Sequence, residues 1–477
     1  MTDTERIAFL EAELTTLRAY VGELLAENAA LKRQLAQDSR NSSKPPASDG
    51  LARRPRATRR PSGKKPGGQP GHAGHTLAVV ADPDVIQAHA PAICEQCQQP
   101  LDGVPGVVVE RRQVQDLPPL RLEVTEHQAL GVTCPACQAV TRGVFPAGVR
   151  APAQYGPRVR AVAVYLHHAQ IVPQERTHEA LADLFGCTVS DGTVARWVAQ
   201  AGQALAPTVA QIADVVTLSA HQHADETGIR IGGKLHWLHV NSTRWLTHLA
   251  WHPKRGAAAT AAIGIWPRFH GRATHDRWAS YDAYPDCTHS LCGAHLLREL
   301  ALVAEQDGQA WASALADVLR GMCAAATEWR HQGADAIPAE ERTTWIAQYH
   351  DLLAQGFAAQ PPPAGALVDA GRFRQRHGRR KQSPAKNLLD ALLQHSDRVL
   401  AFVDDLTIPF TNNQAERDLR MAKVQQKVAG TFRSDVGATA YCRLRSYLAT
   451  MRKQDRNRLE ALVAVFTDRP LPVAWGS

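Results

Sequence analysis

The sequence predicts a multidomain α/β protein, and three patterns point to that class. A heptad repeat near the start predicts a coiled coil, and two separated C-x-x-C pairs predict a small metal-held β module. From Ser219 onward, strand-like and helix-like segments follow one another in an order that predicts a mixed sheet flanked by helices. We divide the 477 residues into the regions 1–40, 41–80, 81–150, 151–215, 216–300, 301–405, 406–455 and 456–477.

The composition is that of a globular protein with a local excess of positive charge. Hydrophobic residues make up 44% of the sequence, and no run reaches the ~18 apolar residues that a membrane span needs. The net charge is +8, and residues 41–76 alone carry eight Lys or Arg and one acid. The N-terminus is acidic and has no signal pattern, so we expect a cytoplasmic protein without a membrane partner. The nine cysteines fit that compartment if some bind metal and the others stay reduced.

The first region, residues 1–40, carries the heptad. The seam positions are Ile7, Leu10, Leu14, Leu17, Val21, Leu24, Asn28, Leu31 and Leu35. Asn28 stands at an a position, which favours a parallel two-stranded coiled coil because its amide pairs with its mate. Between two such helices, Glu13 would face Arg18, and Glu27 would face Lys32. We therefore expect a leucine-zipper-like homodimer; the alternative is a single amphipathic helix packed on its own protein.

Residues 41–80 are rich in Pro, Gly, Ser and Arg, a composition that cannot build a core. We expect a basic, disordered linker that lies along DNA phosphates without reading sequence. Its candidate contacts are Arg53, Arg54, Arg56, Arg59, Arg60, Lys64 and Lys65. For residues 41–80 and for a second basic run, 371–386, two explanations are open: a nucleic-acid patch or a solvated linker.

Residues 81–150 contain the two C-x-x-C pairs. The four thiolates of Cys94, Cys97, Cys134 and Cys137 suit one closed, tetrahedral and structural Zn²⁺ site. The 36 residues between the pairs exceed the usual spacing, and the segment 107–130 alternates like the strands of a zinc-ribbon hairpin. The alternative is four ordinary reduced cysteines.

Residues 151–215 are expected to be helical. Within them, 174–200 has the pattern of a helix-turn-helix, whose second helix can enter a DNA major groove. The first helix should end near Gly186 and Ser190 should cap the second, leaving Thr193 and Arg196 on one face. A plain helical hairpin would give the same pattern.

The regions 216–300 and 406–455 are expected to form one core. The order of three strands, helix, strand, helix and strand suits the ribonuclease-H-like fold. Asp225 falls in the first strand and Asp276 ends the fourth, and these strands are neighbours in that fold. Glu416, on a later helix, is the natural third acid.

Three clustered carboxylates suit two-metal phosphoryl transfer with two Mg²⁺ ions, or Mn²⁺, because these hard ions prefer oxygen ligands. The cations that follow Glu416 would then hold DNA phosphates. They are Arg417, Arg420, Lys423 and Lys427. Each acid also has a simpler explanation: Asp225 as a strand-end surface charge, Asp276 as a helix cap, and Glu416 as the acid of a capping box headed by Asn413.

Four motifs together resemble the DDE transposases of the insertion sequence 66 family. They are "HADETG" (223–228), "HDRWASYDAY" (275–284), "CGAHLLREL" (292–300) and "NNQAERDLR" (412–420). The zipper-like helix, "KKPGGQPGHAGHTL" (64–77) and the C-x-x-C pairs resemble that family's upstream modules in the same order. The chain departs from the family's more basic run in "HLLREL", which keeps only Arg298 and puts local DNA contacts in doubt.

The resemblance implies an acidic triad of Asp225, Asp276 and Glu416, with a helical insertion between the last two at about 301–405. It also implies binding of transposon terminal repeats and target DNA in the bacterial nucleoid, and small accessory proteins encoded by the same element. Cys292 and His295 form a C-x-x-H for which we expect a bracing role; metal binding and ordinary packing are the alternatives.

These patterns together predict a DDE transposase that cuts element ends and joins them to target DNA. Two rivals remain open from the sequence. One is a ribonuclease-H-like nuclease of repair or recombination, against which the helical insertion and the end-binding modules argue. The other is a non-catalytic, zinc-containing DNA-binding regulator or a decayed transposase, against which the intact acids argue.

Overall fold

A computed structural model describes residues 2–38, 41–42, 67, 71, 74, 76–360 and 382–474. The seven cations of the predicted basic arm, Arg53 to Lys65, lie outside the described residues, and so does most of the second basic run, 371–386.

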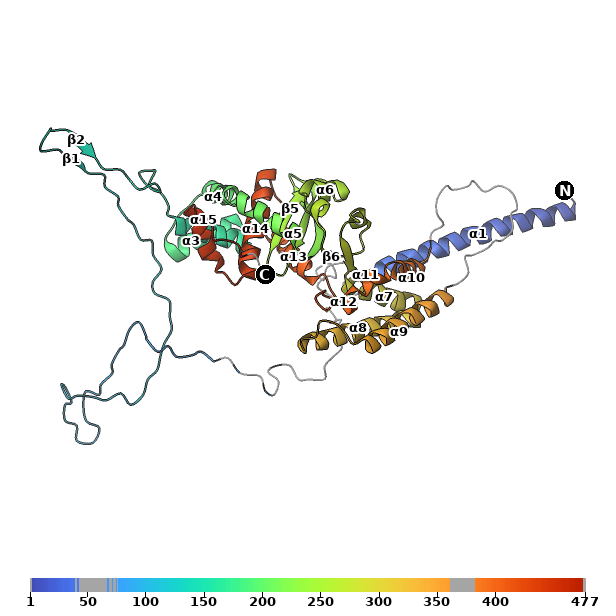
Figure 1. Cartoon of the computed structure of the whole chain (residues 1–477), viewed down its shortest axis with the longest axis horizontal. Coiled ribbons are helices and arrows are strands. Elements are labelled where there is room, and N and C mark those ends of the chain that lie inside the picture. The colour runs from blue at the N-terminus through green and yellow to red at the C-terminus, as the bar shows by residue number, and fades with distance from the viewer. Residues whose placement is uncertain are drawn as a thin grey trace.

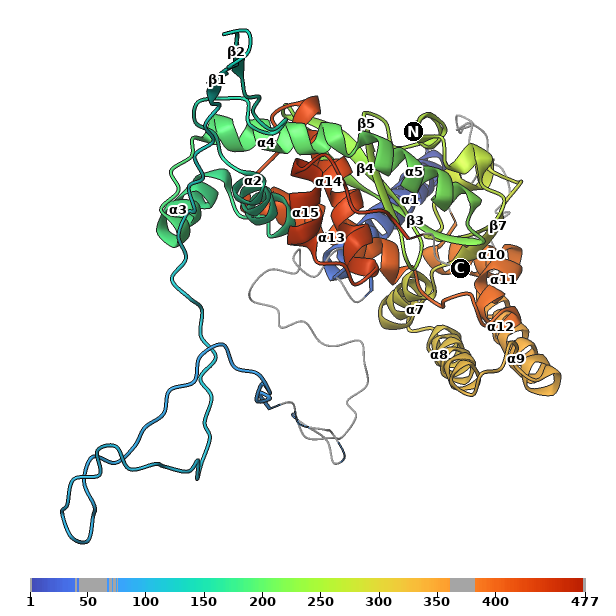
Figure 2. The same cartoon turned by 60° about the vertical axis from the view of Figure 1, so that its left-hand side comes forward.

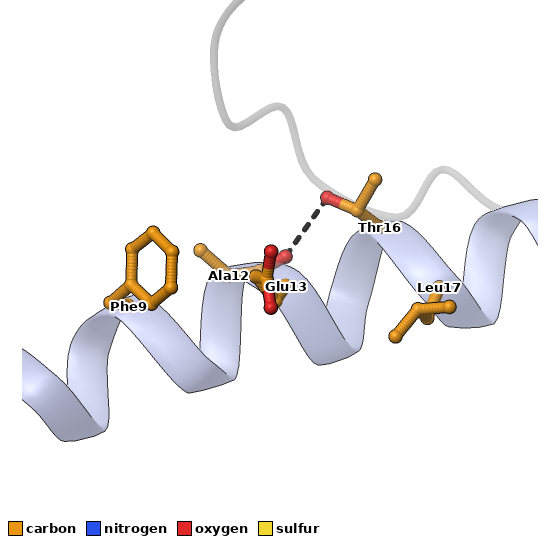
Figure 3. A pocket seen from close by; sticks show the side chains of 5 residues that line it. All are labelled: Phe9, Ala12, Glu13, Thr16 and Leu17. Carbon is orange, nitrogen blue, oxygen red and sulfur yellow. Dashed lines mark hydrogen bonds between the residues drawn. The ribbon is translucent and has the colours of Figure 1, made fainter.

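The chain begins with a long helix, α1 (Asp3–Ala36), drawn in blue in Figure 1. The apolar seam residues of its heptad are exposed, from 46% at Leu24 to 79% at Leu35. Figure 3 shows a shallow hollow on this helix, where the Thr16 hydroxyl donates to the Ala12 carbonyl at 2.9 Å. Near the other end of α1, Arg33 pairs with Asp307 of another helix. The seam itself therefore stays uncovered within one chain.

Residues 76–150 contain short regular elements. Strands β1 (Gly131–Thr133) and β2 (Val140–Arg142) form an antiparallel hairpin. The strands predicted over 107–130 are absent, so that prediction is wrong. The apolar side chains there are exposed, for example Val107 at 86% and Val109 at 93%. No second layer buries the alternating apolar side chains, so a strand is not stabilised there.

Four described α-helices lie between the β1–β2 hairpin and the main sheet. They are α2 (Pro157–Val164), which continues into the π-helical turn η2 (Tyr165–Ala169), α3 (Gln174–Phe185), α4 (Asp191–Ala204) and α5 (Ala206–Leu218). The predicted ends of the helix pair are confirmed. Helix α3 stops at Gly186, whose φ of +63° suits glycine, and Ser190 Oγ accepts the Thr193 N–H at the start of α4.

The main sheet has five strands in the order β5-β4-β3-β6-β7. They are β3 (His221–Ile231), β4 (Lys234–Ser242), β5 (Thr247–His252), β6 (Arg272–His275) and β7 (Thr288–Leu291). The first three pair antiparallel through a Gly232–Gly233 turn and a second hairpin, and β3, β6 and β7 are parallel. The first and fourth strands are therefore neighbours, as the element order predicted.

Each face of this sheet is covered differently. One face packs on α13 (Asn413–Val428) and α14 (Asp435–Lys453), through a core that includes Ile229, Leu419 and Tyr441. The other face packs on the 3₁₀ turns η3 (Trp266–Arg268) and η4 (Ala279–Ala283), and α6 (Ala257–Ile263) contacts both turns. Since strand residues alternate between faces, neighbours along β3 face different layers.

The interval between the sheet and α13 is helical, as its apolar periodicity predicted. It contains α7 (Gly293–Asp307), α8 (Ala310–His331), α9 (Ala339–Ala358), α10 (Pro384–Gln394), α11 (Ser396–Val399) and α12 (Ala401–Asp404). These helices share a core of their own around Leu319, Tyr349 and Leu389. In Figure 2 they form a bundle beside the sheet, and the last helix, α15 (Arg458–Phe466), packs against α2 instead.

Candidate active site

Three acids from separate elements meet at one edge of the sheet. Asp225 lies within β3, Asp276 directly follows β6, and Glu416 lies in the first turn of α13. Strand β6 pairs with residues 221–223 of β3 and then ends, so Asp276 emerges beside the middle of β3. The structure thus places the three residues that the sequence singled out near enough for the charges of Asp276 and Glu416 to act on Asp225.

The pKa of Asp225 shows how closely these acids interact. Burial raises the pKa of this carboxyl well above its ordinary value, and the charges of Glu226, Asp276 and Glu416 raise it further. Negative charges held this close destabilise one another unless a cation lies between them. Their donor atoms are oxygens, which are the ligands that Mg²⁺ and Mn²⁺ prefer. Their ligand atoms do not, however, all lie within 4.8 Å of one another: among the described residues, the group that meets this distance is Cys292, His295 and Glu416.

Asn412 explains how Glu416 reaches this edge. Its side-chain amide donates to the Ala224 carbonyl at 2.7 Å, and its Oδ1 lies 2.9 Å from His223 Nδ1. Helix α13 begins at Asn413, and no side chain caps it. The capping box of Asn413 and Glu416 is therefore wrong, because the residue before the helix uses its amide to hold α13 against β3.

The Glu416 carboxylate faces the start of α7 instead. Glu416 Oε1 lies 3.9 Å from both His295 Nδ1 and Arg298 Nη2. Cys292 Sγ, a ring nitrogen of His295 and a Glu416 oxygen all lie within 4.8 Å of one another. Cys292 is buried, burial raises its pKa to about 11, and its Sγ accepts the Asn412 N–H at 3.1 Å. The thiol thus contacts the segment that leads into α13.

The cations of α13 divide into two groups. Lys423 Nζ donates to the Gly228 carbonyl at 3.1 Å; burial lowers the pKa of this amine, while the charge of Asp225 raises it. Lys423 is therefore tied to β3 beside the acids. Arg417, Arg420 and Lys427 are exposed, and Arg417 contacts the Asn413 carbonyl at 3.3 Å on its own helix.

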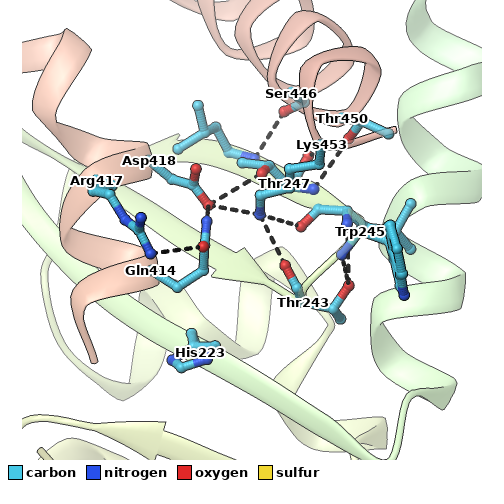
Figure 4. A network of polar contacts seen from close by, with 12 residues as sticks. His223, Thr243, Trp245, Thr247, Gln414, Arg417, Asp418, Ser446, Thr450 and Lys453 are labelled. Atoms are coloured by element: carbon cyan, nitrogen blue, oxygen red, sulfur yellow. Dashed lines mark hydrogen bonds and ion pairs between the residues drawn. The ribbon is translucent and has the colours of Figure 1, made fainter. Parts of the chain in front are cut away.

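Two groups of residues near the acids had no signal in the sequence. Behind β3, Glu226 binds Arg255 and Tyr281. On the other side, Asp418 binds Lys453, Thr247 and Gln414, as Figure 4 shows. The hydrogen-bonded partners in these two groups lie 4 to 171 residues apart along the chain. Only the position of Glu226 next to Asp225 can be read from the motif "HADETG".

The four cysteines of residues 81–150 form two turns of the same kind. Cys94 and Cys134 each donate their N–H to a carbonyl five residues on, and Gln98 and Gln138 both have a φ of 60°. Backbone hydrogen bonds lower the pKa of Cys94 and of Cys134. The structure does not bring the two turns together: among the described residues, the metal-ligand group within 4.8 Å is that of Cys292, His295 and Glu416.

The helix pair α3–α4 places the other predicted DNA contacts. Arg196 is exposed, whereas Thr193 is half-buried with its hydroxyl 3.0 Å from that of Ser190. On its opposite side α4 packs against α14, where Gly202 allows close approach to Ala440. The exposed face of α4 therefore includes Arg196.

The model of a family described as Transposase IS66 family matches residues 152–440, more than half of the chain. The chain belongs to this family. The match implies a DNA-processing enzyme and spans all three acids. A second model, of a family of unknown function, DUF6444, matches residues 2–78 of this IS66-family transposase. Comparison with curated proteins gives no match. No helix in the described part of the chain is long and apolar enough to cross a membrane.

Proposed function

We propose that this IS66-family transposase binds transposon-end DNA, cuts it, and joins the freed 3′-hydroxyl to target DNA through Asp225, Asp276 and Glu416. The observation that carries the proposal is the position of Asp225, where burial raises the pKa of its carboxyl and the charges of Glu226, Asp276 and Glu416 raise it further. The strand order β5-β4-β3-β6-β7 supports a ribonuclease-H-like core.

The three carboxylates would hold two Mg²⁺ or Mn²⁺ ions. When bound, such ions activate the attacking oxygen and stabilise the leaving oxygen of an in-line displacement at phosphorus. The other residues have separate tasks. Asn412 holds α13 against β3, so Glu416 stays at the edge. Arg298 and Lys423 lie beside the acids and offset their charge when a phosphate approaches.

DNA contacts in this proposal come from several surfaces. Arg417, Arg420 and Lys427 would hold phosphates next to the acids, and α4 would present Arg196 to a groove. The cations of the arm, Arg53 to Lys65, would add contacts without sequence choice. Zn²⁺ bound by Cys94, Cys97, Cys134 and Cys137 would fix the module 81–150, and α1 would join two copies. Small proteins of the same element would assist.

The test measures cleavage and joining of a labelled duplex that carries the end of the element from which this chain comes. Glu416→Gln keeps the size of the side chain and removes the charge. We expect it to lower cleavage by about 10²-fold or more, the scale for one lost charge-stabilising group, with DNA binding retained. Glu340→Gln, at an exposed acid in the first turn of α9, is the matched control. Chelation should abolish cleavage by wild type.

The outcomes separate the rival functions. Cleavage without joining indicates a nuclease rather than a transposase. Unchanged cleavage by Glu416→Gln removes this residue from the metal site. In that case Asp404, Asp405 and Asp418 are weak substitutes, because Arg342, Thr407 and Lys453 respectively already bind them.

A further inference from the structure

Arg255 is held in a fixed position behind the candidate active site. Glu226 follows Asp225 in β3, so its side chain lies on the opposite face of the sheet. Glu226 Oε1 accepts Arg255 Nε at 2.9 Å and Nη2 at 2.7 Å, and Oε2 accepts the Tyr281 hydroxyl. The Glu226 side chain is 1% exposed, whereas that of Arg255 is 40% exposed. One edge of the guanidinium is therefore buried and the other reaches solvent.

Two tryptophans fix the plane of this guanidinium. Its carbon lies 4.8 Å from the centre of the Trp237 ring and 4.4 Å from that of Trp278. Stacking on two indoles leaves the donors at the rim of the guanidinium free to point outward in its plane. The backbone N–H of Trp278 donates to Asp276 Oδ1 at 3.1 Å, in a turn two residues after that acid. The backbone of one stacking residue therefore contacts one of the three acids.

The donors of Arg255 exceed what Glu226 uses. A guanidinium carries five N–H groups, and Glu226 accepts one from Nε and one from Nη2. Within the part of the chain that the structure describes, Nη1 has no hydrogen-bond partner. A guanidinium that merely neutralised Glu226 would need neither the two indoles nor the exposed edge. A planar, oriented set of free donors suits the oxygens of a phosphate.

We propose that Arg255 binds a DNA backbone phosphate that flanks the cut, on the sheet face opposite α13. This rests on the proposed function, since the same three acids define where the cut lies. The DNA strand would then be held on both sides of the acids, by the exposed cations of α13 on one side and by Arg255 on the other. Glu226 cancels the net charge of Arg255, so the contact depends on directed hydrogen bonds and acts at one phosphate.

The test uses a labelled element-end duplex and a set of duplexes in which one phosphate near the cut is a neutral methylphosphonate. Binding is read by fluorescence anisotropy in chelator, which needs no cleavage, and cleavage is read with Mg²⁺. For wild type, we expect a methylphosphonate at one phosphate that the cations of α13 do not contact to weaken binding about tenfold. This is the scale for one hydrogen bond to a charged group.

The deciding variant is the pair Arg255→Met and Glu226→Gln, which removes the guanidinium without leaving a buried carboxylate unpaired. We expect it to bind the unmodified duplex about tenfold more weakly than wild type does. The methylphosphonate at that one position should then weaken binding by the variant no further. The control is Arg268→Met with Asp214→Asn, an exposed Arg–carboxylate pair in which both Nη atoms contact one carboxylate oxygen at 3.2 Å.

The outcomes are distinct. If the pair variant binds and cuts like wild type, Arg255 serves Glu226 alone and the proposal is overturned. If the pair variant melts well below wild type, Arg255→Lys is used instead, because lysine keeps the charge but lacks the planar group that stacks between the two indoles. The methylphosphonate at the same position must then no longer weaken binding by Arg255→Lys. Binding that responds to the methylphosphonate with no cleavage in Mg²⁺ would leave Arg255 as a phosphate contact while overturning the proposed function.

Discussion

Asp418 Oδ2 accepts Lys453 Nζ at 2.9 Å, and both side chains are only about one-tenth exposed, at 10% and 11%. The same oxygen accepts Thr247 Oγ1 and Gln414 Nε2, each at 3.1 Å, and Lys453 also donates to two backbone carbonyls near β5 (Figure 4). Asp418 lies two residues after Glu416, so it faces another side of α13. This network fixes the helix that carries the third acid to α14 and to the sheet.

Breaking this pair should destabilise the protein. Asp418→Asn leaves the Lys453 ammonium buried without its charge partner, which costs about 3 kcal/mol in the free energy of unfolding. Asp418→Asn combined with Lys453→Met should cost less, because no buried charge is left alone. Urea unfolding measures both. The more exposed pair of Lys386 and Asp390, whose side chains are 33% and 35% exposed, is the control, and Asp390→Asn there should cost under about 1 kcal/mol. Equal costs at the two sites would contradict this account.

Local signals in the sequence were enough to place several features. Gly186 ends α3 and Ser190 caps α4, each through hydrogen bonds to residues within five positions. The local sequence is therefore enough to predict both roles. The order of strands and helices predicted that Asp225 and Asp276 lie on neighbouring strands. That inference rested on the strand order of the ribonuclease-H-like fold, because the crossover through α6 joins β5 to β6, which are not neighbours in the sheet.

Other features depend on partners far along the chain. Asn412 does not cap α13, because its amide finds the Ala224 carbonyl 188 residues away. Arg255 and Glu226 meet across 29 residues, and no local pattern distinguishes that arginine from other surface arginines. The strands predicted over 107–130 fail for a related reason. Alternation alone does not make a strand, and Gln113 instead bonds both backbone groups of Val80 through its side-chain amide.

Zinc should bring the two cysteine turns together. Each turn already lowers the pKa of its first thiol through backbone hydrogen bonds, which favours the thiolate that binds metal. We expect native mass spectrometry to find one Zn²⁺ per chain, lost in Cys94→Ser and equally in Cys134→Ser. Cys323→Ser, at a half-buried cysteine of α8, should keep the ion. Loss of zinc in only one of the two knuckle variants would mean that the turns do not share an ion.

The exposed seam of α1 predicts a dimer. Leu17 is 57% exposed in the single chain and lies on the seam, whereas Phe9 is 56% exposed and lies off it. Leu17→Asp should therefore shift the full-length chain toward monomer in sedimentation velocity, because a charge at a d position is buried in a coiled coil. Phe9→Asp should leave the dimer intact. If both variants shift equally toward monomer, association depends on non-specific hydrophobic contacts of the helix rather than on the heptad seam.

Buried histidines of the main sheet make its stability depend on pH. Burial alone lowers the pKa of His248 to about 4, and burial is also the largest cause that lowers the pKa of His239 to about 4 and of His275 to about 3. In the unfolded chain these rings titrate near 6.5, so below that pH the unfolded state binds more protons than the folded state. The free energy of unfolding must therefore fall as pH drops from about 6.5 toward 4, by about 1.4 kcal/mol per pH unit for each such ring.

His248→Gln tests this pH dependence at one ring. The residue is 9% exposed, and its Nδ1 has no hydrogen-bond partner among the described residues, so no such partner at Nδ1 favours protonation in the folded state. The variant should lose about 1.4 kcal/mol per pH unit of slope between pH 6 and 5, whatever its stability at pH 7. Urea unfolding at each pH measures the slope. An unchanged slope in His248→Gln would mean that this ring is protonated or hydrated in the native state.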